Sequence, residues 1–385
     1  MSLAANWPEI SAALQCDDGV PATWRALFGN RARSLLVAAD GGTKARDAVN
    51  FFCGTWPLRL SGELTLHSQR WFGYPQPVMV GQIHAALPRQ LGLEMTDLSG
   101  TALQCGSSGP LQKLVLFSPS SENHEARTVK IALRPTADIA IEREVAWLDR
   151  LVGHSGIAGR VPRLVKHGKL PSGRSFVTAT AVETGVRLDG FSPPVADFLH
   201  ALHVCDEITR PWSEHSDVRD MESALDACRH YFPPAAGKAM NAAWQSLYLS
   251  LGMVKLPSVV QHGDFAPWNM KMHDGQLCVF DWEYAKCSSN MLADYLHFHL
   301  VQRALGWRKP SIGYLTSTLM PAAEKFVRQS STLEKTAISV IPSLVLAYLV
   351  DTVVFYVQTT QLFDPQDAVV NAYMPLIAAQ SRWMP

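Results

Sequence analysis

The alternation of apolar and polar positions predicts strands and one helix in the middle of the chain. In "ARTVKIALRP", residues 126–135, apolar residues alternate with polar ones, which is typical of a half-buried strand. The following stretch, 139–152, repeats apolar residues at helical spacing and predicts a helix. The apolar run 256–260 predicts a short buried strand, and Asp274-Gly275 between two apolar stretches predicts a hairpin. Helical periodicity dominates from about residue 183 onward.

The chain thereby divides into three predicted parts: 1–95, 96–182 and 183–385. The first reads as a small α/β extension with a strand over 33–40 and helices over 43–52 and 76–91, separated by stretches rich in Gly and Pro. Its role is unknown; a structural cap and a substrate or partner module are both open. The middle part reads as strands, one helix and strands, and the last part as mainly helical.

Composition excludes several classes of protein. The 385 residues contain 34 bases and 34 acids, so there is no basic field for nucleic acid or an anionic membrane. The seven cysteines form no C-x-x-C pair, which disfavours a zinc site or a disulfide framework. The first ten residues lack a secretion leader, and we expect a cytoplasmic protein.

One apolar stretch, 340–357, is long enough to suggest a membrane span. Asp351 near its middle would be costly in lipid, and the flanks lack a basic stop. We therefore expect a buried helix of a large helical lobe and no membrane span.

The candidate chemistry lies in "VVQHGDFAPWN", 259–269, and the hairpin that follows it. Gly263 and Pro267 prevent a simple helix after the strand, so the polar residues lie on a loop. A returning strand brings Asp281 back beside Asn269, with Asp264 nearby. One amide oxygen and one carboxylate suit Mg²⁺, while the remaining carboxylate, Asp264, can accept a proton from a hydroxyl.

"HGDFAPWN" followed by "VFDWEYA" resembles the aminoglycoside phosphotransferase and choline kinase superfamily. The resemblance implies an α+β, protein-kinase-like two-lobed fold, here with the additional N-terminal extension. It implies ATP and Mg²⁺ as cofactors, with 96–182 as the nucleotide-binding lobe. By the same resemblance Asp264 is the catalytic base, and Asn269 and Asp281 hold the metal. His262 and Asp294 support the catalytic loop.

A kinase-like interpretation also requires groups upstream that hold the nucleotide. Lys130 in the predicted strand fits the phosphate-binding lysine, and Glu144 on the following helix fits its partner, with Glu142 as a near competitor. Between two strand-like runs, the segment Ser107, Ser108 and Gly109 could cover the phosphates through backbone N–H groups, although a plain hairpin turn is an equal alternative. Backbone groups near 180–182 are expected to meet adenine.

The predicted reaction is transfer of the ATP γ-phosphate to a hydroxyl of a small molecule, with a sugar-like or amino-sugar acceptor favoured. Seven acids against two arginines in 205–226 could attract a cationic acceptor, but a solvated helix face explains them equally well. A choline or ethanolamine kinase is the alternative, for which Trp212 and Trp268 could form an aromatic cage. A nucleotide-binding pseudokinase is the alternative from another class. The oligomeric state is left open.

Overall fold

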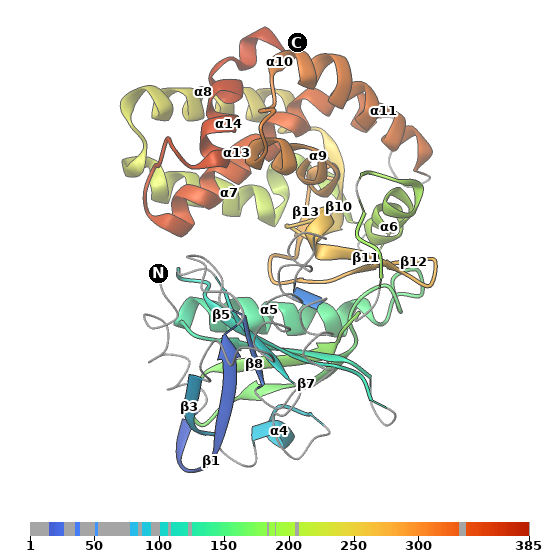
Figure 1. Ribbon diagram of the computed structural model, residues 1–385. Coiled ribbons are helices and arrows are strands. Elements are labelled where there is room, and N and C mark those ends of the chain that lie inside the picture. Colours follow the sequence, from blue (N-terminus) through green and yellow to red (C-terminus); the bar gives the residue numbers. More distant parts are fainter. Residues whose placement is uncertain are drawn as a thin grey trace. The chain divides into compact units, whose positions relative to one another are not determined.

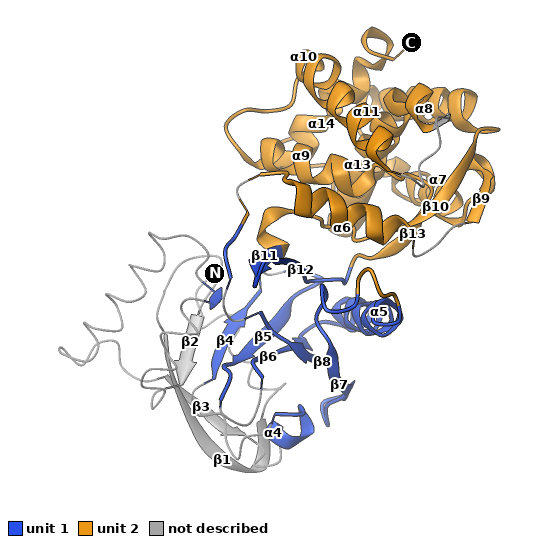
Figure 2. Cartoon of the chain, turned by 90° about the vertical axis from the view of Figure 1, so that its right-hand side faces the viewer, with its two compact units in different colours: residues 1–153, 158–187, 270–283 blue, residues 154–157, 188–269, 284–385 orange. Residues whose placement is uncertain are grey.

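A computed structural model of the chain divides it into two compact units (Figure 2). Unit 1 contains residues 1–153, 158–187 and 270–283, and unit 2 contains residues 154–157, 188–269 and 284–385. The structure describes residues 15–26, 35–38, 51–52, 78–83, 87–93, 101–106, 109–121, 125–182, 185–188, 190–204, 208–330 and 336–384. Residues 270–283 thus lie in unit 1, although their place in the chain falls inside the predicted helical part.

Unit 1 is built on an eight-stranded antiparallel sheet with the strand order β3-β1-β2-β4-β5-β6-β8-β7. Its strands are β1 (Gln15–Ala26), β2 (Leu35–Ala38), β3 (Val78–Ile83), β4 (Ala102–Cys105), β5 (Lys113–Ser118), β6 (Arg127–Ala132), β7 (Leu164–Lys169) and β8 (Ser175–Thr180). The strand predicted within 126–135 is confirmed as β6. Its alternation buries Val129 and Ile131 and turns Lys130 to the opposite face of the sheet.

The helix that follows β6 is α5, Pro135–Leu151, which confirms the predicted helix (Figure 1). Proline in the first turn suits the start of a helix, because the N–H that it lacks has no intrahelical partner there. Ala137 and Ile141 pack with Ala132 of β6 and Val177 of β8 in one buried cluster. This packing holds α5 against β6 and β8, which are neighbours in the sheet.

The segment before residue 96 contributes strands to the same sheet. β2 pairs with β4, with Leu36 opposite Leu103, and confirms the strand predicted over 33–40. The helix predicted over 76–91 is wrong for its first half: Val78–Ile83 forms β3, and only Leu87–Gln90 is helical, as α4. Pairing with β1 outweighs the helical spacing of the apolar residues, and the two valines favour a strand. Most of the helix predicted over 43–52 lies outside the described residues.

The hairpin predicted around Asp274-Gly275 is confirmed. It joins β11 (Met270–His273) to β12 (Gln276–Val279), with Met270 opposite Val279. Asp274 and Gly275 have φ angles of 48° and 76°, the left-handed conformation that a two-residue turn of this type requires. Aspartate and glycine tolerate that conformation better than other residues, which is why the pair specifies the turn.

Unit 2 is mainly helical and contains a small antiparallel sheet. The sheet has the order β13-β10-β9, with β9 (Ile208–Pro211), β10 (Lys255–Gln261) and β13 (Lys286–Ser288). Its helices are α6 (Pro193–His203), α7 (Ser216–Cys228), α8 (Pro234–Leu251), α9 (Ala293–Leu305), α10 (Ile312–Tyr314), α11 (Met320–Gln329), α12 (Thr336–Ser339), α13 (Ile341–Thr360) and α14 (Ala368–Ala378). β10 confirms the short strand predicted over 256–260.

α13 is the helix around which the others of unit 2 pack, and it contacts α7, α8, α9 and α14 (Figure 1). Among the described residues it is the one helix long and apolar enough to cross a membrane by length and composition, and 67% of its most apolar window is buried in the protein. Asp351, which is only partly buried, pairs with Lys286 of β13 at 2.8 Å. The contacts agree with a core helix of the helical unit.

Candidate active site

A loop at the end of β10 holds the residues of the first motif. Gly263 has a φ of +86°, and a Cβ there would lie 2.5 Å from the backbone oxygen of Tyr284. Only glycine fits this conformation and this close approach without a shift of the backbone. The loop ends in a short 3₁₀ turn, Pro267–Asn269, which leads directly into β11.

Asp294, in the first turn of α9, holds this loop through two hydrogen bonds. One carboxylate oxygen accepts the backbone N–H of His262 at 2.6 Å, and the other accepts that of Gly263 at 3.0 Å. Burial raises the pKa of Asp294, although His262 and the two N–H groups act in the opposite direction. His262 is fully buried, and its Nδ1 accepts the backbone N–H of Asp264 at 3.2 Å. These bonds connect the start of the loop to α9 and to the buried His262 ring.

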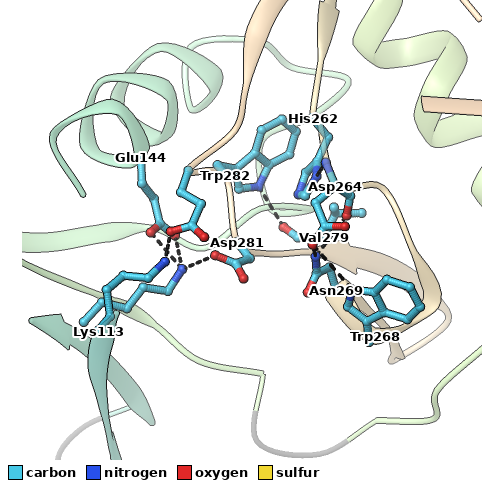
Figure 3. A network of polar contacts seen from close by, with 11 residues as sticks. Lys113, Glu144, His262, Asp264, Trp268, Asn269, Val279, Asp281 and Trp282 are labelled. Carbon is cyan, nitrogen blue, oxygen red and sulfur yellow. Dashed lines mark hydrogen bonds and ion pairs between the residues drawn. The ribbon is translucent and has the colours of Figure 1, made fainter. Parts of the chain in front are cut away.

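The carboxylate of Asp264 is held by donors on both oxygens, and Figure 3 shows those from Asn269 and Trp268. Asn269 Nδ2 donates to Oδ2 at 2.8 Å, and Trp268 Nε1 approaches the same oxygen at 3.4 Å. His297 Nε2 lies 3.0 Å from Oδ1. With its side chain still 28% exposed, Asp264 is both fixed in orientation and open to a ligand.

The second group of charges lies within unit 1. Lys130 Nζ lies 2.7 and 2.8 Å from the two carboxylate oxygens of Glu144 and 2.6 Å from Oδ1 of Asp281. Glu142 instead accepts the hydroxyl of Ser175 and lies 3.7 Å from Lys169. The sequence left the choice between the two glutamates open, and the structure pairs Lys130 with Glu144.

Burial alone would lower the pKa of Lys130, but the carboxylates of Asp281 and Glu144 outweigh it and raise the pKa overall. The lysine is therefore charged at neutral pH. Asp281 itself has a φ of +76°, an uncommon conformation for a residue with a side chain. Such local strain is found most often at functional sites, where the surrounding structure maintains it.

A second lysine and a second glutamate lie beside this group, and the sequence interpretation missed both. Lys113 of β5 forms an ion pair with Glu283, and both side chains are largely buried (Figure 3). In the β5–β6 register Lys130 lies opposite Val115, so Lys113 is its diagonal neighbour on the same face of the sheet. The pairing register of β5 and β6 is what brings the two lysines together, and the sequence of either strand alone does not reveal that register.

His297 was also missed, and here the sequence did contain a signal. It follows Asp294 by three positions on α9, a spacing that places two side chains on one face of a helix. A residue three positions after the loop-supporting aspartate is therefore directed toward the same loop.

The predicted phosphate-covering loop is only partly described. Ser107 and Ser108 lie outside the described residues, and Gly109 is exposed in the middle of the connection between β4 and β5. Gly106 N–H donates to the backbone oxygen of Lys113 at 2.8 Å, which closes the hairpin behind the loop.

Comparison with known proteins decides the class of this site. Residues 121–300 match the profile of a family described as the phosphotransferase enzyme family. The match covers just under half of the chain, and this segment is similar to that family. The resemblance drawn from the sequence is confirmed over this segment, and the match agrees with a phosphotransferase enzyme.

Solved structures of phosphotransferases share the fold. The chain is similar to the apo form of a thermostable mutant of aminoglycoside phosphotransferase APH(4)-Ia, with a TM-score of 0.51 and 14% identity over 73% of this chain and 94% of that one. It is also similar to a thermostable mutant of the same enzyme in a ternary complex with ADP and hygromycin B, with a TM-score of 0.51 and 13% identity over 76% of this chain and 97% of that one. No curated protein sequence matches the chain. The two-lobed, kinase-like α+β fold is therefore established.

Hydrogen bonds orient the amide of Asn269. Its Nδ2 donates to the backbone oxygen of Asp264 at 2.9 Å and to the carboxylate of the same residue at 2.8 Å. Both partners can only accept, so the amide nitrogen faces them and the amide oxygen points away. An amide oxygen is a ligand type that Mg²⁺ accepts.

Proposed function

We propose that the chain is a Mg-ATP-dependent phosphotransferase whose acceptor is a small, sugar-like or amino-sugar molecule and whose base is Asp264. The observation behind this proposal is the carboxylate of Asp264, which donors hold on both oxygens while it remains 28% exposed. A carboxylate held in this way can accept the proton of a hydroxyl as the hydroxyl oxygen attacks phosphorus. Catalysis then rests mainly on positioning and charge neutralisation.

The nucleotide is assigned to the charged group of unit 1. Lys130 would bind phosphate oxygens while Glu144 fixes its orientation, and backbone N–H groups of 107–109 would cover the phosphates. Asn269 and Asp281 would hold Mg²⁺, which when bound neutralises charge on the phosphates. A cytoplasmic location, where ATP is available, is part of the same proposal.

The aromatic cage of a choline kinase finds little support here. Trp212 is only 1% exposed and packs against Trp244 in the core, with ring centroids 5.7 Å apart. Trp268 is directed by its Nε1 toward the Asp264 carboxylate. The acceptor proposal therefore favours sugars over quaternary ammonium compounds.

The test is a transfer assay with γ-labelled ATP and Mg²⁺ against sugars, amino sugars, aminoglycosides and choline. We expect label in a sugar-like or amino-sugar product, and about a hundredfold less or lower with Asp264→Asn under the same conditions. Labelled phosphocholine as the sole product would overturn the acceptor class. Tight Mg-ATP binding without transfer to any compound or to water would instead favour the pseudokinase alternative.

A further inference from the structure

A chain of three side-chain contacts runs behind Asp264 within unit 2. His297 Nε2 lies 3.0 Å from Oδ1 of Asp264, and its Nδ1 lies 3.1 Å from the hydroxyl of Tyr348. That hydroxyl lies 3.3 Å from the hydroxyl of Tyr373. The three residues come from three different helices: α9, α13 and α14.

The chemistry of the groups fixes the direction of the first contact. An ionised carboxylate can only accept, so Nε2 of His297 carries a proton and donates it to Asp264. In the neutral imidazole Nδ1 is then an acceptor, which makes Tyr348 its donor. Tyr348 can in turn accept from Tyr373. The hydrogen bonds can thus all run in one direction: Tyr373 donates to Tyr348, Tyr348 to His297 and His297 to Asp264.

Burial keeps this arrangement in place. Tyr348 is 4% exposed and Tyr373 is fully buried, so neither hydroxyl can exchange its partner freely with water. Burial raises the pKa of Tyr348 further above its ordinary value, and its hydroxyl therefore stays protonated at neutral pH. The Tyr348 hydroxyl can donate to Nδ1, which agrees with the tautomer of His297 in which Nε2 donates to the Asp264 carboxylate.

His297 acts on the oxygen of Asp264 that the other two donors leave alone. Asn269 and Trp268 both approach Oδ2, whereas His297 approaches Oδ1. A carboxylate with donors on one oxygen only can still rotate, and the histidine removes that freedom. Oδ1 has two lone pairs, so a hydroxyl acceptor can still bind to it.

We propose that His297 is a positioning residue for Asp264, and that Tyr348 and Tyr373 set the tautomer in which it donates. The inference rests on the proposed role of Asp264 as base. His297 does not accept the proton of the reaction. It holds the carboxylate in the orientation that accepts it.

The kinetic test compares three substitutions on one helix, with Mg-ATP turnover to ADP measured both with water and with the best acceptor of the panel. His297→Phe removes the donor and keeps a ring, and kcat should fall by about ten- to a hundredfold with the KM for ATP unchanged. His297→Gln returns a donor near the position of Nε2 and should recover most of the loss. His299→Phe is the matched control, since His299 packs against Tyr295 and Phe191 instead, and should leave kcat unchanged.

A second readout does not depend on turnover. Nitrogen-15 spectra of the imidazoles should show His297 as the Nε2-protonated tautomer, and Tyr348→Phe should shift it toward a mixture. A Nδ1-protonated His297 in the parent protein, or a spectrum unchanged by Tyr348→Phe, would overturn the proposal.

Different results would contradict the role of Asp264 as base and the positioning role of His297. If Asp264→Asn turns over normally, the proposed function itself is wrong. If Asp264→Asn is inactive while His297→Phe keeps the parent kcat, the base assignment stands and the positioning role is overturned. Equal losses in His297→Phe and His297→Gln, with unchanged melting temperatures, would also overturn it.

Discussion

Lys130 and Glu144 are fourteen positions apart in the chain, yet two contacts of 2.7 and 2.8 Å join the ammonium to both carboxylate oxygens. The pair connects β6 to the buried face of α5, where Glu144 is 3% exposed. A charge buried to this degree is costly unless it is paired, so neither residue serves as an ordinary surface charge.

Lys130→Ala should therefore reduce turnover by about a hundredfold or more, because it removes a donor aimed at the phosphates. The measurement is kcat/KM for Mg-ATP, with a circular dichroism spectrum to show that the fold is kept. Lys169→Ala is the matched control: it breaks the exposed pair with Glu142 in the same unit and should change little. Parent-like turnover of Lys130→Ala would rule out the phosphate-binding role.

The two aspartates of the motif should separate nucleotide binding from transfer. Asp264→Asn keeps the shape and removes the base, so Mg-ATP affinity should stay near the parent value while transfer falls by about a hundredfold or more. Asp281→Asn removes a charge from the metal site, so Mg-dependent ATP binding should weaken together with turnover, and raised Mg²⁺ should restore part of it. Calorimetric titration of Mg-ATP into both variants checks this division. Equal loss of affinity in the two would contradict it.

The ion pair between Lys113 and Glu283 should contribute to the stability of unit 1. Lys113→Met leaves the largely buried Glu283 without this ammonium, and a loss of about 3–5 kcal/mol in the free energy of unfolding is expected for one partner of a buried pair. Adding Glu283→Gln should recover a part of it, because no uncompensated carboxylate then remains. Urea denaturation of the single and double variants gives both values. A double variant less stable than Lys113→Met would argue against a compensated pair.

Two buried histidines predict a loss of stability in acid. Burial lowers the pKa of His203 to about 3 and that of His299 to about 4, whereas a histidine in the unfolded chain titrates near 6.5. The unfolded chain thus binds protons that the folded one does not. The stability present above about pH 6.5 is lost progressively as the pH falls toward these lower values.

Melting temperatures between pH 7.5 and 4 test this. His203→Leu should flatten the decline with pH, while the same change at exposed His230 should leave the slope as it is. An unaltered slope in His203→Leu would show that other groups cause the acid loss.

The sequence predicted the elements whose signals are local. The Asp274-Gly275 turn, the alternation around Lys130 and the helix after it are all specified by neighbouring residues, and the structure has them as β11–β12, β6 and α5. Residues 78–83 were predicted helical because apolar spacing alone does not reveal a pairing partner. That partner is β1, more than fifty positions earlier in the chain.

The candidate site shows the same division between local and distant information. Asp264, Asn269 and Asp281 come from one motif and were found together. Lys113 and Glu283 meet only because β5 pairs with β6 and the hairpin lies in the same unit, so no window of sequence contains both. The contact of His297 with Asp264 depends on where α9 packs. Its tyrosine partners, Tyr348 and Tyr373, lie on helices far along the chain.

The pairing of β2 with β4 has a consequence for how such a chain can lengthen. Strand pairing uses backbone groups and makes few demands on side chains, so a sheet edge accepts new strands with little change to the residues already present. In this chain β1, β2 and β3 occupy the edge at β4, while Lys113 and Lys130 lie one and two strands further in. Additional strands at this edge therefore need not alter the residues around Lys113 and Lys130. The same edge could hold a new binding surface without a second hydrophobic core.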